Sequence, residues 1–66
     1  MKTCYVVYYD YKRLDGKTVR IWCFYHTDKE YNNGDTCIIY GQRCIVKGKY
    51  ADILAANGGK PPSYLW

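Results

Sequence analysis

The chain has 66 residues and a formal net charge of +4 at pH 7, with ten Lys and Arg against six Asp and Glu. This length gives one small domain of marginal stability, because such a domain buries only about 60% of its unfolded surface. The basic balance excludes a mimic of DNA, and no apolar stretch approaches the roughly 20 residues that a membrane-spanning helix needs.

Residues 4–26 are predicted to form a β-hairpin, because two runs rich in aromatic and β-branched residues flank a turn sequence. Asp15 and Gly16 favour a two-residue type I′ turn, in which both central residues have positive φ. That turn fixes the register of the two strands. It places Tyr9 opposite Trp22 in the predicted hairpin.

The predicted register gives this hairpin two faces, and neither is typical of a surface exposed to water. One face is rich in small and β-branched residues, and we predict that it lies on the core: Cys4, Val6, Tyr8, Val19, Ile21, Cys23 and Tyr25. The other is an aromatic stripe: Tyr5, Val7, Tyr9, Tyr11, Arg20, Trp22, Phe24 and His26. A stripe of this size is either covered by more protein or used for binding.

A polar loop over residues 27–35 precedes a second predicted hairpin at about residues 36–47. Gly41 before Gln42 is typical of a type II′ turn. The inner face of this hairpin then carries Cys37, Ile39, Cys44 and Val46. The sequence of residues 32–50 is similar to a segment of small SH3-like barrels. Glycine-punctuated hairpins share this likeness in general, and we infer no function from it.

The C-terminal part is predicted to contain one short helix at about residues 50–56, which has no good N-cap and depends on packing. Residues 57–66 form a tail, which we expect to dock because its last residues are Tyr64, Leu65 and Trp66. The predicted fold is β-rich α+β in a single domain. Two antiparallel hairpins form a four-stranded sheet, or a small barrel, with the helix and the docked tail.

No motif predicts catalysis or a cofactor. The GKT at residues 16–18 lacks the earlier glycine and the following helix of a phosphate loop. The four cysteines form no Cys-x-x-Cys pair, so we expect free structural thiols, with a zinc site or a disulfide as lesser alternatives. His26 is the only histidine and has no predicted nucleophile beside it. We therefore expect no enzyme activity and no metal.

The composition predicts a binding protein, because the chain has nine Tyr and two Trp, and such side chains suit contact surfaces. We predict these ligand-binding residues: Tyr5, Tyr9, Tyr11, Arg13, Arg20, Trp22, Phe24 and His26. Rings would stack on bases while cations hold phosphates, so the expected ligand is a nucleotide signal or single-stranded nucleic acid. The alternative is an inhibitor that docks the same face onto a host protein.

The chain resembles small phage-encoded anti-defence proteins, anti-CRISPR proteins among them, in its size and tyrosine content rather than in any motif. We expect a stand-alone protein of the cytoplasm, which would be the host cytoplasm if a phage encodes it. The start MKTCYVVYYD lacks the cleavage site of a signal peptide. We also expect a homo-oligomer, because two apolar faces are more than one helix and a tail can cover.

Overall fold

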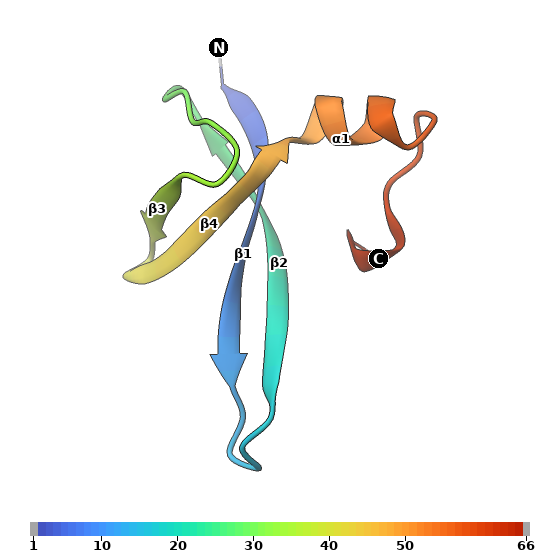
Figure 1. The fold of residues 1–66 in the computed structure, drawn as a ribbon. Coiled ribbons are helices and arrows are strands. Elements are labelled where there is room, and N and C mark those ends of the chain that lie inside the picture. The colour runs from blue at the N-terminus through green and yellow to red at the C-terminus, as the bar shows by residue number, and fades with distance from the viewer. Residues whose placement is uncertain (1, 66) are drawn as a thin grey trace.

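The computed structural model describes residues 2–65, and its strands form one antiparallel sheet in the order β2-β1-β4-β3. The elements are β1 (Thr3–Lys12), β2 (Thr18–Thr27), β3 (Thr36–Ile39), β4 (Gln42–Lys49), the helix α1 (Tyr50–Ala56) and the 3-10 helix η1 (Ser63–Leu65) (Figure 1). The predicted β-rich α+β fold of two hairpins and one short helix is confirmed. The helix begins and ends at the residues that the sequence indicated.

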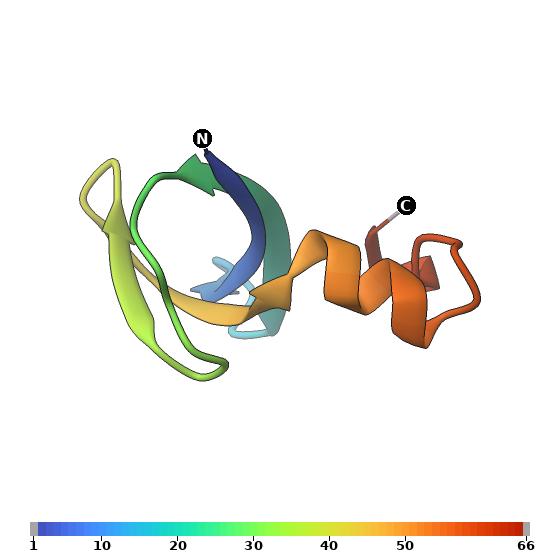
Figure 2. The same cartoon turned by 90° about the horizontal axis from the view of Figure 1, so that it is seen from above.

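The sheet is strongly curled. Seen from above, its strands follow the wall of an open ring, and the loop between β2 and β3 crosses one side of it (Figure 2). A β-bulge contributes to this bend, since the pairing of β1 with β4 shifts register between Val6 and Val7. The two edge strands, β2 and β3, do not pair with each other. The ring is therefore a curled sheet rather than a closed barrel.

The first hairpin has a three-residue loop and not the predicted two-residue turn. The Arg13 N–H donates to the Lys17 carbonyl (2.7 Å), and the Gly16 N–H donates to the Arg13 carbonyl (3.0 Å). Within this loop only Gly16 has positive φ, at 87°. This is a type I turn followed by a left-handed glycine. Asp15 stays outside the left-handed region, and its carboxylate accepts the Lys17 N–H (3.0 Å).

The predicted register of this hairpin is therefore wrong by one residue. Tyr8 lies opposite Trp22, and Tyr9 lies opposite Ile21. Opposite residues of an antiparallel pair share a face, so a slip of one residue exchanges the faces of one strand. The predicted stripe is divided: Tyr5, Val7, Tyr9 and Tyr11 lie on the inner face of the ring, and Arg20, Trp22, Phe24 and His26 lie on the outer face.

The core of the protein lies on the inner face, which is the opposite face of β1 from the predicted one. Its buried residues are Tyr5, Val7, Cys37, Cys44 and Val46, with Tyr9, Tyr25, Tyr31 and Ile39 packed against them. Cys4, predicted to be a core thiol, lies on the outer face. Tyr5 can be fully buried because its hydroxyl accepts the Tyr31 N–H (3.0 Å).

The second hairpin turns one residue earlier than predicted, at Tyr40 and Gly41. Both have positive φ, 49° and 77°, so the turn is of type I′ and not of type II′. Cys37 consequently pairs with Cys44. The register is shifted by two residues, which changes partners but not faces. The predicted inner face of this hairpin, with Cys37 and Cys44 on it, is confirmed.

Tyr40→Asn is expected to raise the free energy of unfolding by about 1 kcal/mol, because a left-handed conformation costs most residues about that much and costs asparagine less. The Tyr40 side chain is fully exposed, so no packing is lost. Urea denaturation followed by circular dichroism measures the change. Tyr11→Asn is the control. Tyr11 is exposed on an extended strand, so this variant should not be more stable than the wild-type protein. A loss of stability in Tyr40→Asn would contradict the type I′ turn.

The helix and the tail lie against the outer face of the sheet. Helix α1 contacts β1 and β4, and η1 contacts β2. Val6, on the outer face of β1, has no exposed surface. The Phe24 and Tyr50 rings meet edge to face with their centroids 5.0 Å apart. The tail is thus docked as predicted as far as Leu65, and Trp66 lies outside the described residues.

Candidate functional site

The predicted binding residues do not form one surface. The Tyr5 side chain is fully buried, and Tyr9 is half-buried on the inner face. The remaining residues fall into two groups: Tyr11 and Arg13 lie near the end of the first hairpin, while Arg20, Trp22, Phe24 and His26 follow the outer face of β2. The structure therefore brings together Arg20 and Trp22 as predicted, and separates them from Tyr9.

The end of the first hairpin projects beyond the rest of the sheet (Figure 1). The pairing of β1 with β4 ends at Tyr8, so beyond it β1 and β2 pair only with each other. We call residues 9–21 the arm. Its charged residues are Lys12, Arg13, Lys17 and Arg20 against Asp10 and Asp15. The arm thus has a formal net charge of +2, half of the +4 of the whole chain.

Two of the four cations on the arm are free to meet a ligand. The Arg20 Nε donates to the Asp10 carboxylate at 3.0 Å, and the Arg13 guanidinium lies 3.5 Å from the Asp15 carboxylate. Within the part of the chain that the structure describes, Lys12 and Lys17 form no ion pair.

Apolar side chains are exposed beside these cations. Tyr11 is 53% exposed on the inner face of the arm, and Leu14 is fully exposed at its tip. The arm therefore exposes an aromatic ring on its inner face, while Lys12, the next residue of β1, lies on the outer face.

Beside the arm, the outer face carries a row of side chains in contact with one another that we call the aromatic column: Arg20, Tyr8, Trp22 and Tyr64. The Arg20 guanidinium lies 4.3 Å from the centre of the Tyr8 ring, a cation–π contact. The Tyr8 and Trp22 centroids are 5.0 Å apart, and the Trp22 and Tyr64 centroids are 4.3 Å apart. Sequence reasoning placed Tyr8 in the core because of the wrong register, and it gave Tyr64 no partner.

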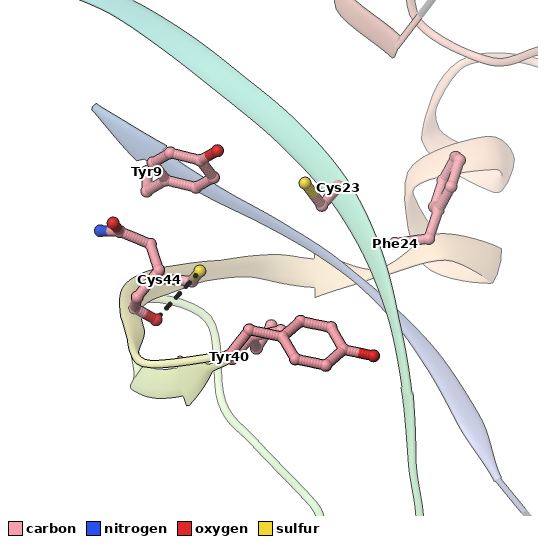
Figure 3. A pocket seen from close by; sticks show the side chains of 7 residues that line it. Tyr9, Cys23, Phe24, Tyr40 and Cys44 are labelled. Carbon is pink, nitrogen blue, oxygen red and sulfur yellow. Dashed lines mark hydrogen bonds between the residues drawn. The ribbon is translucent and has the colours of Figure 1, made fainter. Parts of the chain in front are cut away.

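A pocket of about 430 Å³ opens between β2 and the second hairpin (Figure 3). It is lined by Tyr9, Cys23, Phe24, Ile39, Tyr40, Gln42 and Cys44. Figure 3 shows Cys23 directed toward Tyr9 and the Phe24 ring turned toward α1. A second pocket of about 410 Å³ follows the same boundary, lined by Phe24, Tyr25, His26, Ile38, Ile39 and Tyr40. Neither is lined by Lys or Arg, so neither suits a phosphate.

The four cysteines are free thiols in different environments. Burial raises the pKa of the Cys37 thiol, and it likewise raises the pKa of the Cys4 and Cys44 thiols. Cys23 is exposed. Residues 2–65 contain no group of three or more His, Cys, Asp or Glu side chains that could hold a metal ion.

Alkylation of the native protein by iodoacetamide at pH 8 is expected to modify Cys23 first. The thiolate is the nucleophile, and a raised pKa lowers its fraction at this pH in Cys37 and Cys44, which are also shielded by burial. Peptide mass spectrometry over time measures each site, and in denaturant all four should react. Modification of Cys37 as fast as Cys23 would contradict the described packing.

Comparison with protein-family models, with curated proteins and with solved structures gives no match. Within residues 2–65, no helix has the length and apolar character needed to cross a bilayer. The site is therefore interpreted from its own geometry. Its distinguishing features are the arm, the aromatic column and the two pockets beside the unpaired edges of β2 and β3.

Proposed function

We propose that this chain is a non-catalytic binding protein that holds a phosphate-bearing ligand on its arm, and that single-stranded nucleic acid is the ligand class. The observation that supports this best is the arm itself, which concentrates half of the net charge, leaves Lys12 and Lys17 without an ion pair, and exposes the Tyr11 ring. Cations that follow a backbone, with rings for the bases, are what such binding requires. A projecting ribbon suits an extended strand better than a free nucleotide, which small-molecule sites enclose.

Fluorescence anisotropy with a fluorescein-labelled thymidine 15-mer tests this proposal. If Lys12, Lys17 and one arginine each meet a phosphate, affinity should fall about 20-fold between 50 and 200 mM KCl, because each contact releases counterions. Unlabelled cyclic dinucleotide is the competitor that represents a nucleotide signal. Displacement of the 15-mer by the dinucleotide at equal phosphate concentration would favour the signal over the strand. No binding of either at 50 mM KCl would contradict the proposal.

A second candidate is an inhibitor that docks on a host protein, and the unpaired edges of β2 and β3 favour it. Phe24, Ile38 and Tyr40 are exposed along these edges. Unpaired strand edges with exposed apolar side chains are sites where another chain adds. Binding of this kind would change little with salt, since aromatic contacts rather than phosphate contacts would hold the partner.

Both candidates fit a small anti-defence protein of the kind that phages encode, acting in the cytoplasm of a host cell. The four free thiols support a reducing compartment. We also propose that the chain self-associates, because an unpaired strand edge is a template for a second copy. Sedimentation at micromolar concentration tests this, and a monomer of 7.8 kDa alone would contradict it.

A further inference from the structure

We propose that Tyr64 occupies a base-stacking position on Trp22, and that a base of single-stranded nucleic acid takes this position when the strand binds. The inference rests on the proposed function and adds a second subsite to it. In this scheme the arm holds phosphates, Trp22 stacks a base, and the tail covers Trp22 when no strand is bound.

The Trp22 and Tyr64 rings are tilted relative to each other, but of the ring pairs described in residues 2–65 they come nearest to parallel stacking. Their centroids are 4.3 Å apart and their planes are inclined by 31°. The other ring pairs described in residues 2–65 have longer centroid separations, from 5.0 to 6.4 Å, and interplanar angles of 49° or more. In single-strand binding a base stacks on the face of an aromatic side chain, an arrangement that this tilted contact approaches. Trp22 therefore presents a face that a base would fit.

Trp22 lies next to a cation on the same face of the hairpin. Arg20 precedes it by two residues on β2, a separation of about 6.6 Å along a strand. The Tyr8 ring contacts both side chains. A nucleotide that places its base on Trp22 has its phosphate beside Arg20, which would exchange the Asp10 carboxylate at 3.0 Å for that phosphate. The aromatic column joins the arm at Arg20, and Lys12 lies on this same outer face of the hairpin, so a strand held on the outer face of the arm would lead toward Trp22.

As far as Leu65, the described part of the tail contacts the sheet through side chains. The hydrogen bonds described for residues 58–65 lie within the tail or join it to the end of α1, as in those from the Leu65 N–H to the Pro62 carbonyl and from the Gly59 N–H to the Leu54 carbonyl. No ion pair within residues 2–65 links this segment to a strand. Among the elements, η1 contacts β2. Releasing Tyr64 from Trp22 therefore breaks none of the backbone hydrogen bonds described for residues 2–65.

The test compares Tyr64→Ala with the wild-type protein in binding the labelled thymidine 15-mer. Removing the competing ring should tighten binding about fivefold to tenfold, because a base no longer has to displace it. Tyr64→Phe keeps the ring and should bind as the wild type does. Tyr40→Ala is the matched control, since it removes an exposed tyrosine away from the aromatic column and should leave affinity unchanged.

Two further measurements separate stacking from charge. An abasic strand of the same length should bind wild type and Tyr64→Ala equally, because it has phosphates but no base to stack. In a Trp66→Phe background, the 15-mer should quench the fluorescence of Trp22. If the wild type binds the 15-mer and Tyr64→Ala binds no more tightly, the inference is wrong and the proposed function stands. If neither protein binds the 15-mer, the proposed function fails, and the inference fails with it.

Discussion

Tyr5→Ala is expected to lower the free energy of unfolding by an amount that is a large part of the whole stability of the chain. Truncating a large buried aromatic side chain costs about 3–5 kcal/mol. A domain of this size has a free energy of unfolding of only about 3–10 kcal/mol, from roughly 0.05–0.15 kcal/mol per residue. Tyr5 is 0% exposed, and its ring meets the Tyr31 ring edge to face at 5.5 Å. The substitution therefore removes much of the core of the curled sheet.

Two control variants separate burial from the loss of a tyrosine as such. Tyr5→Phe keeps the ring but leaves the Tyr31 N–H without its acceptor, which should cost about 1–3 kcal/mol. Tyr11→Ala makes the same chemical change on an exposed residue and should shift stability by about 0.5 kcal/mol or less. Urea denaturation followed by circular dichroism measures all three. If Tyr5→Ala were as stable as Tyr11→Ala, the burial of Tyr5 would be contradicted. Tyr5 would then lie on the surface, as the sequence predicted.

The error in placing Tyr5 has a physical origin in the loop of the first hairpin. Asp15 followed by Gly16 fits a two-residue type I′ turn and also a three-residue loop that ends in a left-handed glycine. Polar and apolar alternation normally decides between such registers, because a slip of one residue turns the apolar set outward. Here both faces carry tyrosine and valine, so either register appears equally apolar. The fold class and the element bounds did not depend on this choice and could be predicted.

The candidate site was predictable where it depended on one strand alone. Arg20 and Trp22 share a face because they are two residues apart on β2, whatever the register. The residue opposite Trp22 depends on the register of the hairpin. The predicted register placed Tyr9 there, and the observed register places Tyr8 there. The contact with Tyr64 depends on how the tail returns to β2, and no local pattern encodes that path. A tail rich in apolar residues indicated docking but not its position.

The double variant Lys12→Gln, Lys17→Gln is expected to weaken binding of the thymidine 15-mer about 25-fold at 0.1 M salt. For single strands, the binding constant varies with salt concentration to the power of about −0.7 for each phosphate contact. Each contact therefore raises the binding constant about fivefold at 0.1 M salt compared with its value at 1 M salt. Glutamine keeps most of the side-chain length and removes the charge. The slope of log affinity against log salt should fall by about 1.4 in magnitude, because two contacts are lost.

The matched control is Lys2→Gln, Lys29→Gln, which makes the same change in net charge away from the arm. Both of its lysines are exposed, and they flank Thr3 and Thr27, the paired residues at the opposite end of the hairpin. If the arm is the phosphate-binding element, this control should keep a salt slope close to that of the wild type. Equal losses in the two double variants would show that overall charge, and not the arm, attracts the strand. A loss confined to Lys12→Gln, Lys17→Gln places the phosphates along the projecting strands, within reach of Arg20 and the Trp22 ring.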